Sequence, residues 1–464
     1  MSGYDYRRML DTIRKLSRRN NKITLYKFIN KIHPSQMVNI YRHLHPNERI
    51  NIFNYILRMD GAGQFVKELD ETLKKELFSL IEKDKISTIL SKMNLEDIAE
   101  VLQDLNPELT SKVEKMLNEK KLSKVEEVLK YEDESAGRIM THEYMAFDSK
   151  QTVKESRERF RLDGENIEMP FYIYVVDIKT NEMLGITSLR QLLISDEMKT
   201  LSEIMEKDFI YVGPDEDQEV VAKIISEYNY LALPVLNDNN KLVGIITVDD
   251  VIDVIREEAT EDMFKLAGAG DDEDILLKSV RENAFTRFPW LMASWVGGVL
   301  ALFIISYFES MMIEQVILAS FIPVIIGMGG NIGTQTSTII VRGIATGHVN
   351  VDAFYKVIFK EIKVGALLGV IYGSLLGILG SLLPKLVQVS FFKFQIELSS
   401  LQLGLTVSLS IFFSMLIACV VASIMPVVLF KIGKDPAIST GPFVTTSIDI
   451  LGIIMYFTIA SILI

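Results

Sequence analysis

The sequence predicts a multidomain membrane protein. An α-helical, superhelical N-terminal domain and a duplicated α/β region are joined by a connecting helix to an all-α transmembrane domain of five helices. Helical periodicity fills residues 1–130, a β-α-β pattern occurs twice between 137 and 258, and five long apolar stretches follow Ala284. We expect the helical domain at 1–130, the first α/β copy at 131–200 and the second at 201–250. The connecting helix and its linker are expected at 251–283, and the transmembrane domain at 284–464.

The N-terminal region has apolar residues at spacings of three and four, which is typical of amphipathic helices. Proline follows His33, His45 and Asn106, as it often does at helix starts. The segments 32–44, 45–57 and 95–105 are units of one degenerate repeat, which favours a superhelical stack. We expect its histidines to be surface or capping residues and not metal ligands.

The α/β region contains an internal duplication. Ile139-Met140-Thr141 matches Ile204-Met205-Glu206, and the segment 184–190 matches 243–249. Each copy has an apolar strand pattern ahead of its glycine, at 171–176 and 231–236. The pattern predicts two related α/β modules in tandem.

The second copy leads into one helix that is expected to run from 251 to Leu266 and to end at Gly268–Gly270. Its acidic residues are Asp249, Asp250, Asp253, Glu257, Glu258, Glu261 and Asp262. Arg256 is the single basic residue among them, so the acids are expected to repel one another unless divalent cations bridge them. A solvated helix face is the alternative. We favour a metal-sensing role for the cluster, Asp253 included.

The five apolar stretches are long enough to cross a bilayer. They cover roughly 288–308, 315–343, 361–384, 402–430 and 440–463. The second and fourth contain Gly or Pro, so tilt or local unwinding is expected there. Lys and Arg concentrate after these same two spans, which predicts a cytoplasmic N-terminus and an outer C-terminus in a multi-pass cell-membrane protein.

Charge and cysteine content narrow the function further. The chain has a net charge of −12, and residues 1–283 carry 54 acidic against 40 basic residues. Such acidity argues against a nucleic-acid partner and favours cations. The single cysteine, Cys419, excludes a disulfide framework and a cysteine-based metal site. The charged first thirty residues lack the apolar core of a signal peptide.

The last span contains a lone carboxylate, Asp449, with apolar neighbours on both sides. An acid at that depth is costly and marks an ion or proton path by default. The break at 441–446 would turn carbonyls near Thr445 to a pore. The stretch 327–335 is a second such segment, in which glycines allow close backbone approach and Asn331 and Gln335 supply neutral oxygens. Helix packing through small residues is the alternative for this stretch. Such hard oxygens suit Mg²⁺, Ca²⁺ or Mn²⁺, and Mg²⁺ would stay largely hydrated. One acid per chain suggests that two chains meet at a symmetric pore.

Motifs along the whole chain together resemble those of the MgtE family of magnesium channels and transporters, and the α/β copies resemble tandem cystathionine-β-synthase (CBS) modules. The motifs are Tyr131 to Ala136-Gly137-Arg138-Ile139-Met140-Thr141, Glu257-Glu258-Ala259-Thr260-Glu261-Asp262, Gly330-Asn331-Ile332-Gly333-Thr334-Gln335, Arg342-Gly343, Asp435-Pro436-Ala437 through Gly441-Pro442, and Thr445-Thr446 to Asp449. The resemblance implies a homodimer in a lipid bilayer, with a central pore and a cytosolic Mg²⁺ sensor made by the N domain, the CBS pair and the connecting "plug" helix.

The resemblance also implies residue roles. Asp449 would bind hydrated Mg²⁺ with backbone support near Gly327, Gly330, Asn331 and Thr445. The implied sensor acids and the acid of the inner mouth are Asp217, Glu219, Asp250, Glu258, Glu261, Asp262 and Asp435, with Asp97 as a looser match in the N domain.

Two residues depart from the family's pattern. Asn229 replaces an expected acid, which would weaken one regulatory ion. Gln191 stands where the family often has Asp, which argues against the binding of an adenine nucleotide such as ATP by the first CBS module.

The function expected on this basis is a Mg²⁺-selective channel or transporter that imports Mg²⁺ across the plasma membrane and is closed by cytoplasmic Mg²⁺. One alternative is a secondary transporter of Mg²⁺, Mn²⁺ or Co²⁺ coupled to H⁺ or Na⁺, with Asp449 as its titrating group. Another is a membrane receptor that senses nucleotide without transport. No enzyme is expected, because neither a nucleophile–base arrangement nor a phosphate loop occurs.

Overall fold

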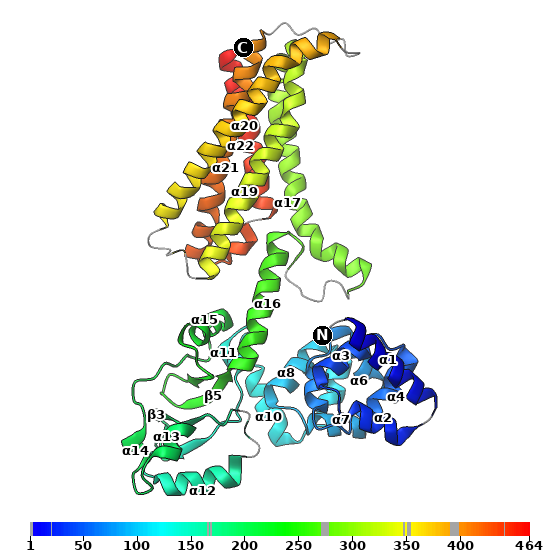
Figure 1. Ribbon diagram of the computed structural model, residues 1–464, viewed down its shortest axis with the longest axis vertical. Helices are drawn as coiled ribbons and strands as arrows, with labels where there is room; N and C mark the ends of the chain where they lie inside the picture. The colour runs from blue at the N-terminus through cyan, green and yellow to red at the C-terminus, as the bar shows by residue number, and fades with distance from the viewer. Residues whose placement is uncertain are drawn as a thin grey trace. The chain divides into compact units, whose positions relative to one another are not determined.

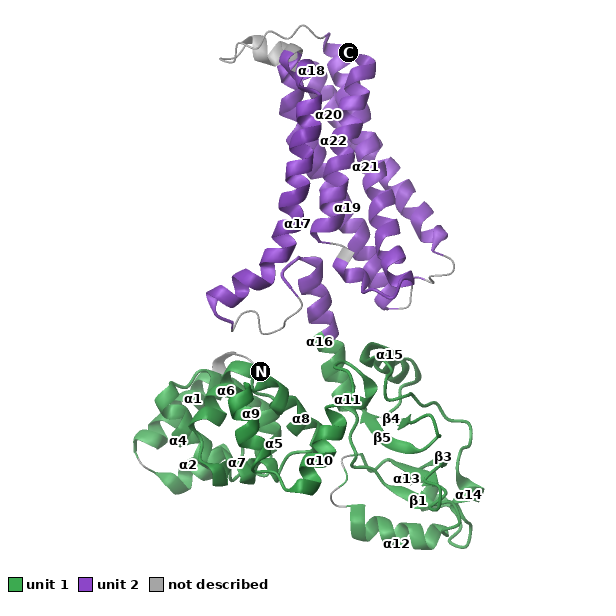
Figure 2. Ribbon diagram, turned by 180° about the vertical axis from the view of Figure 1, so that it is seen from behind, with its two compact units in different colours: residues 1–257 green, residues 258–464 purple. Residues whose placement is uncertain are grey.

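A computed structural model of the chain describes residues 3–19, 21–164, 167, 169–270, 278–346, 349, 354–389, 399–439 and 441–464. The chain forms two compact units, residues 1–257 and 258–464, which are coloured separately in Figure 2.

The N-terminal region consists of short helices, as the sequence predicts. They are α1 (Gly3–Arg18), α2 (Lys22–Ile29), α3 (Pro34–Arg42), α4 (Pro46–Ile56), α5 (Ala62–Lys67), α6 (Glu71–Leu80), α7 (Lys83–Leu90), α8 (Leu95–Asp104), α9 (Pro107–Glu114) and α10 (Glu119–Val128) (Figure 1). His33 and His45 are N-caps followed by Pro at the first helical position, which confirms the capping prediction. Phe53, Phe65 and Phe78 are fully buried in one core, which holds the stack together.

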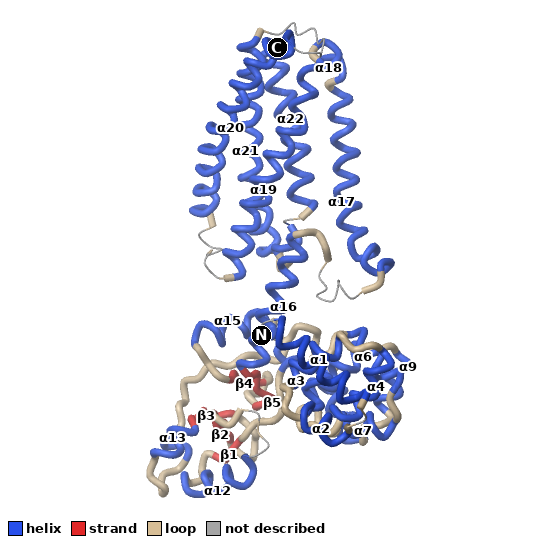
Figure 3. Tube along the Cα trace, turned by 45° about the vertical axis from the view of Figure 1, so that its right-hand side comes forward, coloured by secondary structure: helices blue, strands red, loops and turns tan. Residues whose placement is uncertain are grey.

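The α/β region contains the chain's described strands (Figure 3). Its elements are α11 (Ala136–Ile139), β1 (Ala146–Asp148), α12 (Val153–Asp163), β2 (Tyr172–Val176), β3 (Met183–Ser188), α13 (Leu189–Ile194), α14 (Leu201–Ile204), α15 (Gln218–Tyr228), β4 (Ala232–Leu236) and β5 (Leu242–Thr247). Strand β1 pairs parallel with β2, β2 antiparallel with β3, and β4 antiparallel with β5.

The predicted duplication is visible in reciprocal pairing between the two copies. Thr141 bridges Ile245 in the second copy, and the equivalent Glu206 bridges Ile186 in the first. The glycine beside each bridge allows this close approach: a Cβ on Gly185 would lie 2.5 Å from Glu206 O, and one on Gly244 would lie 2.6 Å from Met140 Sδ. The two modules therefore exchange segments across an approximate two-fold relation.

The connecting helix is α16 (Val248–Leu266), which confirms the predicted single helix up to Leu266. Gly268 and Gly270, with φ of +64° and +110°, end it in a backbone region that favours glycine.

Unit 2 is helical. Its elements are α17 (Val280–Tyr307), α18 (Glu309–Glu314), the 3₁₀ turn η3 (Val316–Phe321), α19 (Ile322–Ala345), α20 (Tyr355–Val389), α21 (Ser400–Lys431), the 3₁₀ turn η5 (Pro436–Ser439) and α22 (Pro442–Leu463). Among the described residues five helical segments are long and apolar enough to cross a membrane, as predicted. Helix α21 packs against α19, α20 and α22 and supplies much of the buried core.

Tilt or local unwinding was expected for the second and fourth spans, and the structure contradicts only local unwinding at their Gly and Pro residues. Helix α19 is continuous through Gly327–Gln335, and α21 is continuous through Pro426. In hydrocarbon each broken backbone hydrogen bond would go unsatisfied, so the helix is retained. Gly329 and Gly333 serve packing instead, because a Cβ on Gly329 would lie 2.9 Å from Ser414 Oγ of α21 and one on Gly333 would collide with Ile448 of α22.

Candidate cation-binding site

Asp449 lies in the second turn of α22 and its side chain is half-buried. It faces α19, since a Cβ on Gly330 would lie 3.8 Å from Asp449 Oδ1 and meet no other described atom that closely. No described residue donates a hydrogen bond to its carboxylate or forms an ion pair with it. A carboxylate placed in this way inside an apolar helix is open to an exogenous cation.

The other residues predicted for the pore lie near this carboxylate in the fold. Gly327, Gly330 and Asn331 share one face of α19 by their spacing, and Asn331 is exposed in the single chain. Thr445 lies one turn before Asp449 on α22, where its hydroxyl donates to Pro442 O at 3.2 Å. The structure thus brings Gly330 and Asp449 together directly and places the remaining three on adjoining surface.

The carbonyl of Gly330 is less free than the sequence suggests. It belongs to the unbroken α19 helix and also accepts a hydrogen bond from Thr334 Oγ1 at 3.0 Å. Asp449 therefore carries the single anionic side chain among these five positions.

A second cluster lies at the start of η5. Asp435 Oδ1 accepts a hydrogen bond from Ala437 N at 2.7 Å, and Asp435 Oδ2 accepts one from Lys265 Nζ at 2.6 Å. Lys265 also pairs with Glu261, one turn earlier on α16. Burial alone would lower the pKa of Lys265, but its bonds to Asp435 and Glu261 outweigh burial and raise the pKa above the ordinary value. Burial and the Asp435 charge raise the pKa of the neighbouring Asp262.

A third cluster joins the N domain to the second CBS module within unit 1. Lys67 Nζ lies 3.2 Å from Asp97 Oδ1 and 3.2 Å from Asp250 Oδ1. Thr247 Oγ1 donates to the other oxygen of Asp250 at 2.7 Å. Two acids predicted as sensor ligands, 153 positions apart in the sequence, thus meet at one lysine.

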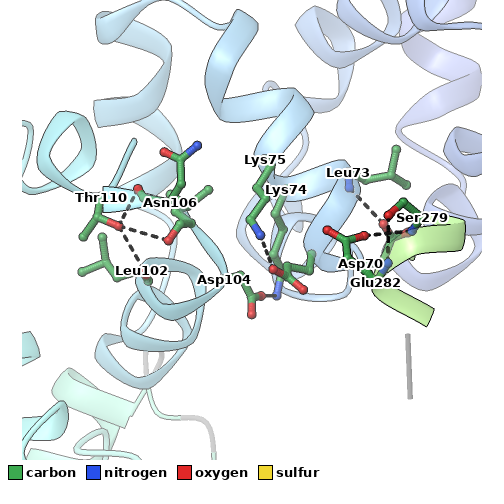
Figure 4. A network of polar contacts seen from close by, with 12 residues as sticks. Asp70, Leu73, Lys74, Lys75, Leu102, Asp104, Asn106, Thr110, Ser279 and Glu282 are labelled. Atoms are coloured by element: carbon green, nitrogen blue, oxygen red, sulfur yellow. Dashed lines mark hydrogen bonds and ion pairs between the residues drawn. The ribbon is translucent and has the colours of Figure 1, made fainter. Parts of the chain in front are cut away.

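Helix α8 continues this acidic face beyond Asp97. Lys74 Nζ lies 2.8 Å from Glu100 Oε1 and 2.6 Å from Asp104 Oδ2, and Lys74 is only 2% exposed. Figure 4 shows Lys74 directed at Asp104. The acids on this face of α8 are therefore neutralised by lysines of the N domain itself.

We predicted that the acids of α16 have no basic partner apart from Arg256, and this prediction is wrong for Asp250 and Glu261. Asp250 pairs with Lys67, and Glu261 pairs with Lys265. The spacing of Glu261 and Lys265 is a helix i,i+4 pair and is readable from the sequence. The Lys67–Asp250 pair joins residues 183 positions apart and has no local signal.

The remaining predicted sensor acids have separate positions. Asp217 is the N-cap of α15 and accepts a hydrogen bond from Glu219 N at 2.7 Å, while Asp253 is exposed on α16. Asn229 takes a left-handed conformation (φ +54°) at the C-cap of α15, which accounts for an amide there. Glu258 is half-buried on α16. Within the described ranges of a single chain, no three His, Cys, Asp or Glu residues group closely enough to hold a metal ion.

These features define the chain as a multi-pass membrane protein with an acidic region outside its membrane-spanning helices. Family models match three of its parts: residues 32–134 match the MgtE intracellular N domain, 201–257 a CBS domain, and 322–459 a divalent cation transporter.

Known relatives extend the match to nearly the whole chain. The magnesium transporter MgtE of Bacillus subtilis is 32% identical over 444 residues, covering 96% of this chain and 95% of that protein. The magnesium transporter MgtE of Thermus thermophilus is 36% identical over 72% of this chain and 71% of that protein. The chain belongs to the MgtE family of magnesium transporters; it is a transporter and not an enzyme.

Solved structures match the cytosolic part. The soluble part of a magnesium transporter is 27% identical with a TM-score of 0.51, over 55% of this chain and 99% of that one. The cytosolic domain of the Mg²⁺ channel MgtE in complex with ATP is 30% identical with a TM-score of 0.51, over 53% of this chain and 99% of that one.

Proposed function

We propose that this protein is a Mg²⁺-selective channel that imports Mg²⁺ across the plasma membrane and closes when cytoplasmic Mg²⁺ binds its acidic sensor. The observation that carries the proposal is the Asp449 carboxylate, which faces Gly330 in an apolar helix pair and has no described protein donor. One carboxylate with nearby neutral oxygens suits a cation that keeps most of its water, as Mg²⁺ does. The N-terminus would lie in the cytoplasm and the C-terminus outside.

The pore would be formed by a homodimer. A single Asp449 is a sparse site for a divalent ion, whereas two copies about a two-fold axis would supply two carboxylates. The exposure of α17 is consistent with this arrangement, because among its described residues only Gly297 is buried within the chain. That helix is left to contact lipid or a second copy.

The sensor would act through charge. At low Mg²⁺ the acids of the N domain, the CBS pair and α16 repel one another and the pore opens. At high Mg²⁺ ions bridge them and conduction stops. The candidate regulatory ligands are Asp97, Asp217, Glu219, Asp250, Asp253, Glu258, Glu261, Asp262 and Asp435. Several weak sites must act together, since each shifts the equilibrium only by its differential affinity for the two states.

ATP is a second candidate ligand, carried over from the relative's cytosolic domain that was solved with it. It would bind between the two CBS copies. Binding of ATP to the purified full-length protein by calorimetry tests this point, and no heat of binding at millimolar ATP would exclude it.

Flux into liposomes tests the transport proposal. Purified protein is reconstituted with a Mg²⁺-sensitive dye inside, and wild type is compared with Asp449→Ala. Loss of one charged ligand costs on the order of 3 kcal/mol, so flux should fall about 100-fold. Glu309→Ala, which removes an exposed acid of α18, serves as the matched control and should conduct normally.

Two results would contradict the channel assignment. Wild-type rates for Asp449→Ala would remove Asp449 from the pore. Flux that requires a proton or Na⁺ gradient at fixed voltage would favour the coupled transporter.

A further inference from the structure

Three helix ends converge where the N domain meets the second CBS module. Lys67 is the last residue of α5, while Asp97 and Asp250 lie in the first turns of α8 and α16. Each charge has the sign that its own helix end favours: a cation at a C-terminus and anions at N-termini. The ammonium is equidistant from the two carboxylates, with both Nζ–Oδ1 distances at 3.2 Å.

The cluster is shielded enough for its charges to matter. The side chains of Lys67, Asp97 and Asp250 are 31%, 13% and 21% exposed. Burial alone would lower the pKa of Lys67, but the charges of Asp97, Asp250 and Glu100 outweigh burial and raise the pKa above its ordinary value. Lys67 is therefore charged at any physiological pH, and without it two largely shielded carboxylates would face each other.

We propose that the Lys67 ammonium is a resident cation that holds the N domain to the second CBS module by pairing Asp97 with Asp250, so that this contact forms without free Mg²⁺. The inference rests on the proposed function and narrows its set of regulatory ligands: Asp97 and Asp250, candidate Mg²⁺ ligands there, are held by Lys67 and do not repel one another at low Mg²⁺. A tethered ammonium is present at fixed, high effective concentration, whereas a metal ion at the same place must be drawn from solution. Mg²⁺ regulation would then be left to the other acids.

The consequence is a division of the sensor. The contact between α5, α8 and the start of α16 stays closed when Mg²⁺ is low. Replacing Lys67 by a neutral residue leaves Asp97 and Asp250 unpaired, and these two carboxylates then form a site that needs a divalent cation. The variant would thus gain a metal dependence that the wild-type contact lacks.

Amide hydrogen exchange on the full-length protein tests the proposal, with peptides covering 62–67, 95–104 and 248–257. Wild type in EDTA should show protection within about twofold of that in millimolar Mg²⁺. In Lys67→Gln, exchange in EDTA should rise about tenfold or more, which corresponds to at least 1.4 kcal/mol of lost stabilisation, and Mg²⁺ should restore protection. Lys67→Arg should behave like wild type.

Lys75→Gln is the matched control, because Lys75 forms an i,i+4 pair with Glu71 on the same domain and bridges nothing else described. Its exchange in the three peptides should not change. If Lys67→Gln also loses protection over residues 34–56, the variant has destabilised the N domain itself. In that case the variant Asp250→Asn is used to test the proposal. That variant leaves the Lys67–Asp97 pair intact and should lose protection at 248–257 without rescue by Mg²⁺.

Three outcomes would overturn the proposal: wild-type peptides that are unprotected in EDTA, Lys67→Gln exchange equal to wild type, or, where Asp250→Asn decides, protection equal to wild type in that variant. The readout does not use flux. Absence of Mg²⁺ inhibition in wild-type liposomes would overturn the proposed function and leave the Lys67 contact standing, so the two failures are distinguishable.

Discussion

The carboxylate of Asp449, in a membrane-spanning helix, and the carboxylates outside these helices have different surroundings in the fold. Asp449 faces a glycine and receives no described hydrogen bond. Asp97, Asp250, Glu261 and Asp435 are each paired with a lysine. An unpartnered acid in an apolar helix attracts a cation with its full negative charge, whereas the charge of a paired acid is largely neutralised by its lysine.

The difference indicates separate tasks for acids that look alike in the sequence. A conduction site must bind its ion weakly enough to release it, and an acid with no built-in partner can exchange one hydrated cation for the next. The proposed regulatory sites must change the balance between two conformations, and a lysine at the same acids would set that balance before any metal binds.

The variant Gly330→Leu tests the proposed role of Asp449 in the membrane-spanning helices and, after Asp449→Ala, has the largest expected effect on Mg²⁺ flux. A side chain at this position points at Asp449, whose Oδ1 lies 3.8 Å from the ideal Cβ position. The added isobutyl group would desolvate the carboxylate and occupy the cation's water shell, so we expect Mg²⁺ flux to fall more than about tenfold.

Val370→Leu on α20 is the control, because Val370 is 54% exposed and the proposal assigns its helix neither to the pore nor to the contact with a second copy. It should conduct within about twofold of wild type. Normal conduction by Gly330→Leu would show that the face of α19 turned toward Asp449 is not part of the ion path.

The cytosolic side is tested by the triple variant Asp253→Asn, Glu258→Gln and Asp262→Asn. These acids lie on α16 and are candidate ligands of the proposed sensor. Their removal should raise the cytoplasmic Mg²⁺ concentration for half-inhibition of flux about tenfold, because the summed differential affinity of the sensor falls. Flux is measured in liposomes at stepped Mg²⁺ on the cytoplasmic side.

The charge-matched control replaces Glu119, Glu126 and Glu127 of α10, three exposed acids of the N domain, with glutamine. An equal rise in the control would mean that net charge, and not the α16 acids, sets the response.

Hydrophobic periodicity predicts most of this fold because it acts locally. The five membrane helices, the end of α16 at Gly268 and the histidine N-caps all depend on residues within a few positions of one another. The expected break in α19 fails for the opposite reason. Whether a glycine unwinds a helix or packs it depends on Ile448 and Ser414, which come from other helices.

The candidate site divides in the same way. A lone acid such as Asp449 is visible in the sequence, but the carbonyl oxygens expected beside it are engaged in helix bonds. We did not predict from the sequence that Lys67 and Lys265 pair with the acids of the candidate sensor. Lys265 could be found from its spacing to Glu261, whereas the position of Lys67 between α8 and α16 depends on how the N domain packs on the second CBS module.

Lys265→Gln has the smallest expected effect and tests whether lysine pairing tunes the inner mouth. The change frees Asp435 and Glu261, which would then bind Mg²⁺ more tightly and lower its half-inhibitory concentration about threefold, a partly exposed pair being worth under about 1 kcal/mol. Lys434→Gln removes the same charge next to Asp435 from a residue with no described ion pair, and it should shift the midpoint less. Equal shifts would assign the effect to surface potential alone. A higher midpoint in Lys265→Gln would show that the pair stabilises the closed pore instead of competing with the ion.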